Sequence, residues 1–160
     1  MVTLLLGVAF VLAGCGSSMH TAKPPHASTL LVLGRRIGPI FFGETKAKIE
    51  AAYGRGQVVR LPPTNAAVVF YPAVSIGVIY GPNSRGKAAA GILETAASQY
   101  RTKTGIGVGS TVRQLKKIGA DCGLTVDSCQ LGVSSSKPGT TFFLGGQHPR
   151  AVRVAISTGH

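Results

Sequence analysis

The stretch AAVVFYPAVSIGVIY, residues 66–80, indicates how the chain folds. It holds two short apolar and β-branched runs, 66–71 and 74–80, with only Pro72 and Ala73 between them. Short runs of this kind, bounded by turn-forming residues, are typical of β-strands. Because the two runs are so close in the chain, we expect neighbouring antiparallel strands.

The same pattern continues on both sides of this stretch. Further strand signals occupy residues 57–61, 88–95, 130–133, 140–144 and 151–157. The turn sequences PPTN, SSKPG and GGQHP lie between or beside them. The chain of 160 residues contains 22 Gly and 9 Pro, a composition that favours turns and strands over long helices.

Two segments resemble each other at an offset of 66 residues. They are PIFFGETKAKIEAA (39–52) and GIGVGSTVRQLKKI (105–118). Each is expected to have a short apolar strand, a glycine, a threonine that can begin a helix, and a helix with an inward apolar position, Ile49 or Leu115. Thr111 and the glutamine three residues later form the pattern of a capping box, which satisfies backbone donors at a helix start.

Glycines at positions 54 and 119 fit the ends of the two short helices. The sequence therefore predicts an α+β fold within 29–160, made of two tandem units of about 37–102 and 103–160. Each unit is expected to be a short helix followed by an antiparallel meander. Units this small bury little alone, so we expect them to share one sheet or interface.

The first residues have the pattern of an export signal. Residues 2–14 are uncharged and almost wholly apolar, but the run is shorter than the roughly 20 residues of a membrane span. The sequence LAGC that ends at Cys15 resembles a bacterial lipobox, which implies a signal peptide over 1–14 and a lipid on Cys15. A flexible tether is expected over 15–28. The alternative is a buried apolar element with a free cysteine.

Three cysteines are present, and their number agrees with export. If Cys15 carries the lipid, Cys122 and Cys129 remain, and in an oxidising compartment they are expected to form a disulfide. The alternative is a metal or redox site. Six intervening residues with no nearby histidine are poor zinc spacing and differ from the Cys-x-x-Cys redox pattern.

The repeated opening also resembles a known superfamily. An apolar residue, Gly-x-Thr, a short helix, a glycine and antiparallel strands are similar to the beta-lactamase-inhibitor-protein and BamE-like superfamily, over about 37–157. The second half, with YRT at 100–102 and GIGVGS at 105–110, also resembles a recurrent group of uncharacterised secreted bacterial proteins. The superfamily resemblance implies small exported or lipid-anchored modules that bind other proteins. No partner-contact residue is carried over from it.

Two stretches look like phosphate-binding loops. In TGIGVGST (104–111), Thr111 can already satisfy the helix start, so we interpret the glycines as structural. GPNSRGKA (81–88) fits the pattern G-x-x-x-x-G-K, but Ala88 stands where a hydroxyl would bind magnesium. Arg85 and Lys87 are better interpreted as an exposed basic tip of a hairpin loop.

No arrangement typical of catalysis is evident. The chain has five acidic residues, and no pair of them is placed by the pattern in one cleft. His148 lies in a turn, and no nucleophile motif accompanies it. We therefore predict no catalytic residues, no metal site and no cofactor.

The net charge of +12 predicts attraction to anions. The residues proposed for anion binding are Arg35, Arg36, Arg113, Lys116 and Lys117. Most aromatic residues lie in strand-like runs instead of being free to stack on bases, and export also argues against nucleic acid. Anionic lipid headgroups or wall polymers are the expected counter-charge.

Together these features predict a non-enzymatic, lipid-anchored protein of the cell envelope that lies outside the cytoplasm. Its expected action is protein binding, as an adaptor or an inhibitor. The alternative is an electrostatic binder of anionic polymer or of the membrane surface. The sequence leaves the partner and the oligomeric state open.

Overall fold

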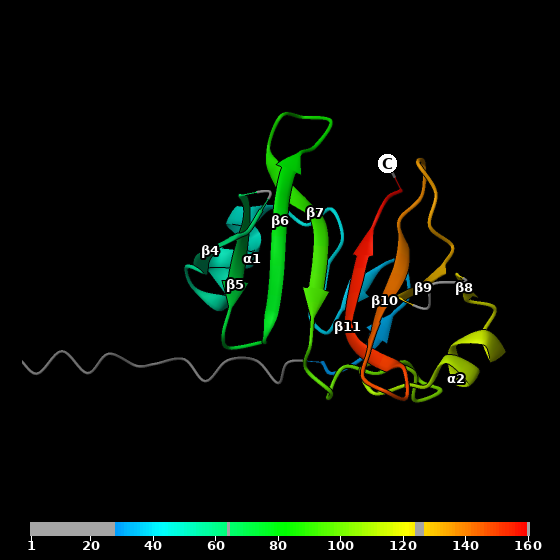
Figure 1. Ribbon diagram of the computed structural model, residues 1–160. Coiled ribbons are helices and arrows are strands. Elements are labelled where there is room, and N and C mark those ends of the chain that lie inside the picture. The colour runs from blue at the N-terminus through cyan, green and yellow to red at the C-terminus, as the bar shows by residue number, and fades with distance from the viewer. Residues whose placement is uncertain (1–27, 64, 124–126, 160) are drawn as a thin grey trace, which may run out of the picture.

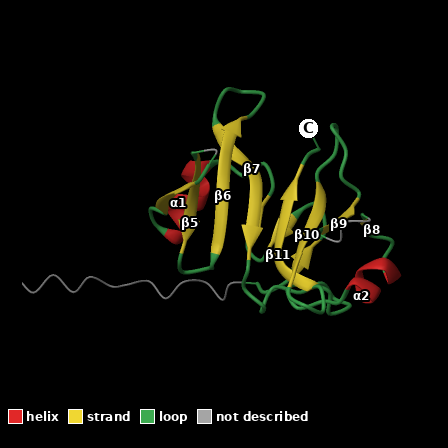
Figure 2. Ribbon diagram, viewed as in Figure 1, coloured by secondary structure: helices red, strands yellow, loops and turns green. Residues whose placement is uncertain are grey.

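The computed structural model describes residues 28–63, 65–123 and 127–159. Within these ranges the chain forms eleven β-strands and two short helices, and the strands make two sheets (Figures 1 and 2). Neither helix of the described chain has the length and apolar content that crossing a membrane requires.

The larger sheet has eight strands, and every neighbouring pair in it is antiparallel. Its first four strands are β4 (Gln57–Leu61), β5 (Ala66–Tyr71), β6 (Ile76–Pro82) and β7 (Ala88–Thr95). The other four are β8 (Asp121–Cys122), β9 (Ser128–Leu131), β10 (Gly139–Gly145) and β11 (Arg150–Ser157). The order across the sheet is β4-β5-β6-β7-β11-β10-β9-β8, so β7 and β11 join the two halves at its centre.

The smaller sheet comes from the first described part of the chain. It contains β1 (Leu31–Val32), β2 (Arg36–Ile37) and β3 (Ile40–Phe41). The helices are α1 (Lys46–Tyr53) and α2 (Val112–Lys117). Figure 1 shows the small sheet and α1 on one side of the large sheet.

The core lies between these layers. Leu31, Ile37 and Ile40 from the small sheet and Ile49 from α1 are at most 2% exposed and belong to one apolar cluster with one face of the large sheet. We call the side of the large sheet that packs against the small sheet and α1 its core face, and the opposite side its outer face. Alternate residues of each strand point to the core face, and these residues are mostly apolar.

The predicted fold class is wrong. The described chain is mostly β and contains two sheets, so it is not a pair of α+β units that each consist of a helix and a meander. The helices have only eight and six residues. The small sheet, which was not predicted as a sheet, adds a second layer of strands. Helices of about two turns do not form a layer of their own, and most of their stability comes from tertiary packing.

The individual strands and helix ends agree better with the predictions made from the sequence than the fold class does. The predicted strands 57–61, 66–71 and 88–95 coincide with β4, β5 and β7. The short apolar strand expected at the start of the segment 39–52 coincides with β3. The pairing of the two-residue strands β1, β2 and β8 was not predicted, because two residues cannot show a periodicity. Gly54 and Gly119 follow the helices with φ of +76° and +83°, the left-handed region in which glycine is favoured.

The helix starts differ from each other. Thr111 and Gln114 form the predicted capping box: the Thr111 side chain accepts from the Gln114 backbone N–H, and Gln114 Oε1 accepts from Thr111 N–H. Thr45 occupies the same position before α1 but makes no capping hydrogen bond through its side chain. The two segments that resemble each other in sequence therefore begin their helices in different ways.

Candidate functional site

The outer face of the large sheet is apolar around β4 and β5. Along β5, Val69 and Tyr71 point into the core, so Val68 and Phe70 point to the outer face. Val68 is only 4% exposed although it lies outside the main core cluster. A buried valine on the outer face means that neighbouring side chains enclose it there.

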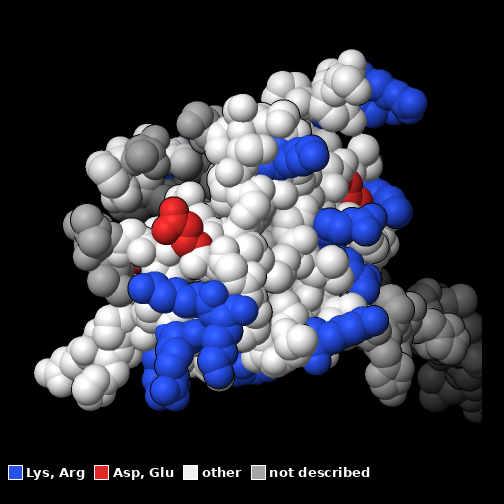
Figure 3. Space-filling view, turned by 90° about the vertical axis from the view of Figure 1, so that its right-hand side faces the viewer, with Lys and Arg blue, Asp and Glu red and all other residues white. Residues whose placement is uncertain are grey.

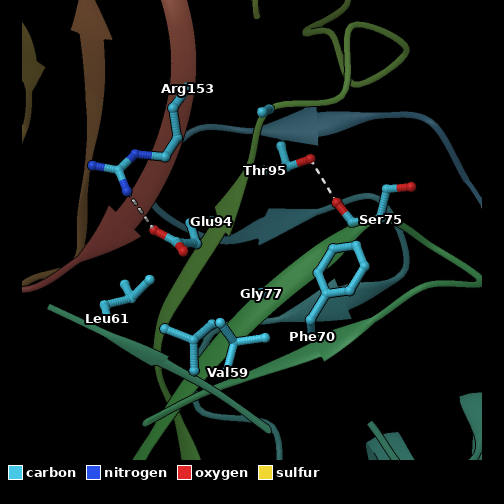
Figure 4. Close-up of a pocket in the computed structure, with 10 residues that line it drawn as sticks. Val59, Leu61, Phe70, Ser75, Gly77, Glu94, Thr95 and Arg153 are labelled. Carbon is cyan, nitrogen blue, oxygen red and sulfur yellow. Dashed lines mark hydrogen bonds and ion pairs between the residues drawn. The ribbon is translucent and has the colours of Figure 1, made fainter. Parts of the chain in front are cut away.

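A groove lies at this point, which we call the outer groove. It has a volume of about 230 Å³ and is open to solvent on one side. Figure 4 shows how its lining residues converge from β4, β5, β6, β7 and β11. The lining residues are Val59, Leu61, Val68, Phe70, Ser75, Gly77, Glu94, Thr95, Ala96 and Arg153.

The floor of the outer groove depends on Gly77 of β6. A Cβ atom at this position would lie 2.9 Å from Val68 Cγ1 and 3.1 Å from Glu94 Cγ. Contacts this short force the neighbours to move. The absence of a side chain at Gly77 therefore leaves room for Val68 and Glu94 to lie side by side across β6.

One ion pair borders the outer groove. Arg153 Nη1 on β11 lies 3.2 Å from Glu94 Oε2 on β7 (Figure 4). The guanidinium carbon of Arg153 also lies 4.1 Å from the centre of the Phe143 ring. Glu94 is the more enclosed partner, with 19% of its side chain exposed against 41% for Arg153. The pair fixes the side of the groove where β7 meets β11.

The turn between β5 and β6 forms the opposite rim. Ser75 has a φ of +52°, in the left-handed region that non-glycine residues seldom adopt. The Thr95 hydroxyl donates to the Ser75 carbonyl at 2.8 Å and accepts from the Ala97 backbone N–H at 3.1 Å. These bonds hold the rim in place without using a charged group.

The chemistry of the outer groove is that of a binding surface. Its lining is mostly apolar, and it contains a single carboxylate, Glu94. The partner of Glu94 is the guanidinium of Arg153, which does not release its proton in proteins. Acid–base catalysis by paired carboxylates needs a second carboxylate within reach of the same substrate. An apolar side chain that enters the groove would be held by burial, and Glu94 could accept one hydrogen bond.

The glycine loop at 104–111 uses most of its backbone N–H groups in hydrogen bonds within the protein. Gly107 N–H donates to Ser110 Oγ, and Gly109 N–H donates to the Ala151 carbonyl. The loop instead turns carbonyl oxygens toward a cation, since Arg101 donates to the carbonyls of Gly105 and Val108 at 2.8 and 2.9 Å. A phosphate cradle needs the opposite polarity.

In the second stretch that resembles a phosphate-binding loop, 81–88, one of its own side chains occupies the backbone donors. Asn83 Oδ1 accepts from the backbone N–H groups of Arg85 and Lys87, each at 3.0 Å. These are donors that a phosphate would have to use. Arg85 and Lys87 are both exposed at the tip of the β6–β7 hairpin, as the sequence predicted.

The five cations proposed for anion binding do not form one compact group. Beside Arg35, the Gly34 N–H donates to Thr140 near the start of β10. Thr111, which begins α2, instead forms a β-bridge with Arg150, and Arg150 pairs with Gly145 at the end of β10. Thr140 and Gly145 are five residues apart on β10, which is about 17 Å at roughly 3.4 Å per residue.

Arg35 and Arg36 therefore lie apart from the cations of α2. Arg36 stacks on Phe41 at 5.1 Å, while Arg113, Lys116 and Lys117 are exposed. Figure 3 shows one side of the molecule, on which Lys and Arg side chains far outnumber Asp and Glu side chains.

The cysteines are placed as follows. Cys15 lies outside the described residues. Cys122 and Cys129 face each other on β8 and β9, and their sulfur atoms are bonded at 2.07 Å. His148 is exposed in the turn between β10 and β11. Within the described ranges, no three His, Cys, Asp or Glu side chains come together as a metal would require.

Comparison with protein-family models, with curated proteins and with solved structures found no match to this chain. The function of the protein therefore has to be inferred from the chemistry of its own surface. The outer groove was not predicted from the sequence. The signal was present in β4 and β5, where VV and AAVVFY are apolar at consecutive positions, so that both faces of the sheet receive apolar side chains.

Proposed function

We propose that the protein is a non-enzymatic binding protein that holds another protein at the outer groove, as an adaptor or an inhibitor does. The observation that carries this proposal is the apolar outer groove, with Val59 44% exposed at its edge and Phe70 partly buried within it. Exposed apolar hollows bordered by a few polar groups are typical of binding sites. The single carboxylate, already paired with Arg153, favours binding over acid–base chemistry.

The proposed location is the outside of the cell membrane, with a lipid on Cys15. The support is the apolar run 2–14 and the sequence LAGC that ends at Cys15, which resembles a lipobox. Metabolic labelling with an alkyne fatty acid tests it: the full chain is expected to be labelled, and Cys15→Ser is expected to remain unlabelled in the same membranes.

A second candidate function is electrostatic binding of an anionic envelope polymer or membrane surface. The supporting observation is the net charge of +12, with Lys and Arg gathered on the side that Figure 3 presents. Binding of this kind is screened by salt, because exposed charges more than about 10 Å apart interact little at roughly 0.1 M ionic strength. Binding in the apolar groove is expected to survive high salt.

The two candidates are separated by photo-crosslinking from defined positions. A photoreactive residue replaces Val59 at the groove in one protein and Lys116 on α2 in the other, each in the full-length chain. The groove proposal expects a protein crosslinked only from position 59, retained at high salt and lost when Phe70→Asp is added.

Crosslinks formed only from position 116 and abolished by salt would favour the electrostatic candidate. If neither position captures a protein that depends on Phe70, the proposal of protein binding at the groove is wrong. Binding of purified partner to wild type and to Phe70→Asp then gives the affinity difference directly.

A further inference from the structure

The two edges of the large sheet differ in how they meet solvent. At one edge, β8 has two residues, one of them the charged Asp121, and it is crosslinked to β9 through Cys122 and Cys129. At the other edge, β4 has five residues in a regular ladder with β5. Short strands and charges protect sheet edges from pairing with other chains. Both a short strand and a charge protect the edge at β8, whereas β4 is longer and has one charged residue, Arg60.

The side chains of β4 add to this contrast. Val58 is 63% exposed and Val59 is 44% exposed, two of the four large apolar residues that the described chain exposes most. No proline, lysine or bulge interrupts β4 from residue 57 to 61. The exposed part of this edge strand, residues 57–60, is a template for a further strand about 14 Å long, at roughly 3.4 Å per residue.

The charges around β4 select the partner. Arg60 lies within the strand and Arg55 two residues before it, and both are exposed. No Asp or Glu occurs anywhere from residue 51 to 93, so β4, β5 and β6 carry no carboxylate of their own. Arg60 Nη1 donates to the Asn65 carbonyl, and the guanidinium has further donors for an incoming carboxylate.

We infer that the outer edge of β4 pairs with an extended segment of a partner protein in which apolar side chains alternate with carboxylates. Side chains of adjacent residues in a strand point to opposite faces. Apolar side chains of the segment would therefore follow Val59 into the outer groove, and its carboxylates would lie on the face of Arg60. This inference rests on the proposed function and specifies the partner's chemistry.

A second copy of this chain is a poorer occupant. Two copies would bring together edges that both carry Arg55 and Arg60, in molecules with a net charge of +12 each. Like charges across a strand pair are destabilising, whereas opposite charges are favourable. Charge complementarity therefore points to an acidic segment.

The test uses the full-length protein and synthetic peptides. The probe is TVEVEVT with blocked ends, and its controls are TVKVKVT, the rearranged TEEVVVT, and TVEVEVT N-methylated at alternate residues. Fluorescence anisotropy measures affinity, and hydrogen exchange measures protection of the β4 amides. The inference expects the probe to bind at least about tenfold more tightly than each control, with new protection at residues 57–60.

Protein variants test the charge pairing. Arg60→Glu is expected to weaken binding of TVEVEVT by about tenfold or more and to strengthen binding of TVKVKVT. Arg113→Glu makes the same charge change on α2, away from β4, and is expected to leave both affinities within about twofold. Thermal unfolding of both variants separates a loss of binding from a loss of folding.

Three outcomes overturn the inference. If the N-methylated peptide binds as well as the probe, the peptide occupies the groove without strand pairing, and the proposed function survives alone. If no peptide binds while position 59 still captures a partner, the partner chemistry is wrong and the function stands. If residues 57–60 become protected as protein concentration rises without peptide, the occupant is a second copy.

Discussion

At the scale of single residues, two glycines of β6 lie in contrasting surroundings. A Cβ atom at Gly77 would lie 2.9 Å from Val68 Cγ1, whereas a Cβ atom at Gly81 would meet nothing within 4 Å. Gly77→Ala is therefore expected to lower the free energy of unfolding by about 1–3 kcal/mol through overpacking. Gly81→Ala, on the same strand, is expected to leave it unchanged or raise it by up to about 1 kcal/mol.

Urea denaturation of the two variants measures this difference. Gly77→Ala is also expected to narrow the outer groove, which a crystal structure of the variant would show. Equal stability of the two variants would mean that Val68 and Glu94 move aside at no cost.

Single residues were predictable only where the chemistry is local. The capping box of Thr111 with Gln114 follows from a spacing of three residues and was found in the sequence. Glu94 and Arg153 are 59 positions apart in the chain, and no local sequence pattern predicts that they pair. The same holds for Arg101, whose role depends on how the glycine loop folds around it.

At the scale of elements, the starts of the two helices provide a matched pair. The Thr111 side chain caps α2, and the Thr45 side chain does not cap α1. Thr111→Ala is expected to lower the free energy of unfolding by about 1 kcal/mol, since a backbone donor loses its partner. Thr45→Ala is expected to cost markedly less. Chemical denaturation of both variants checks the difference, and equal losses would contradict it.

The β5–β6 hairpin carries a pair of tyrosines whose hydroxyls lie 2.7 Å apart, Tyr71 and Tyr80. Burial raises the pKa of Tyr80, and the Tyr71 hydroxyl beside it raises that pKa further; burial also raises the pKa of Tyr71. The folded protein thus keeps these protons at a pH where the unfolded chain releases them. Stability should be intact below about pH 10, the ordinary tyrosine pKa, and fall above it.

The expected fall is up to about 1.4 kcal/mol per pH unit for each proton that only the folded state retains. Denaturation of wild type and Tyr80→Phe from pH 8 to pH 11 measures it, and the variant is expected to lose stability less steeply. If the free energy of unfolding fell equally with pH in both proteins, Tyr80 would not be the cause of the loss of stability at alkaline pH.

Strands were more predictable than the architecture they build. Apolar β-branched runs such as 66–71 specify a strand by composition alone. The predicted fold class was nevertheless wrong, because two short helix signals were interpreted as a structural layer equal to the strands. The two-residue strands of the small sheet depend on pairing with each other and on burial of Leu31, Ile37 and Ile40.

At the scale of the whole molecule, the crosslink between β8 and β9 protects one edge of the sheet. Its removal is expected to lower the free energy of unfolding by about 2.5 kcal/mol, from the entropy that a closed loop of this length removes from the unfolded chain. Thermal unfolding with and without reductant measures the loss. A variant with both Cys122→Ala and Cys129→Ala is expected to unfold at the same temperature with and without reductant. If reductant still lowered its stability, the effect of reductant would not come from this disulfide.

The order of the large sheet also has a kinetic consequence. β11, the last strand of the described chain, lies at its centre between β7 and β10, where Ile156 pairs with Leu93. Contacts between residues so distant in the chain form slowly, because a large loop must close first. A polypeptide still emerging from the ribosome or from a translocation channel therefore cannot complete the sheet until Ser157 has appeared. Until then the molecule remains two partial sheets, each with an open edge.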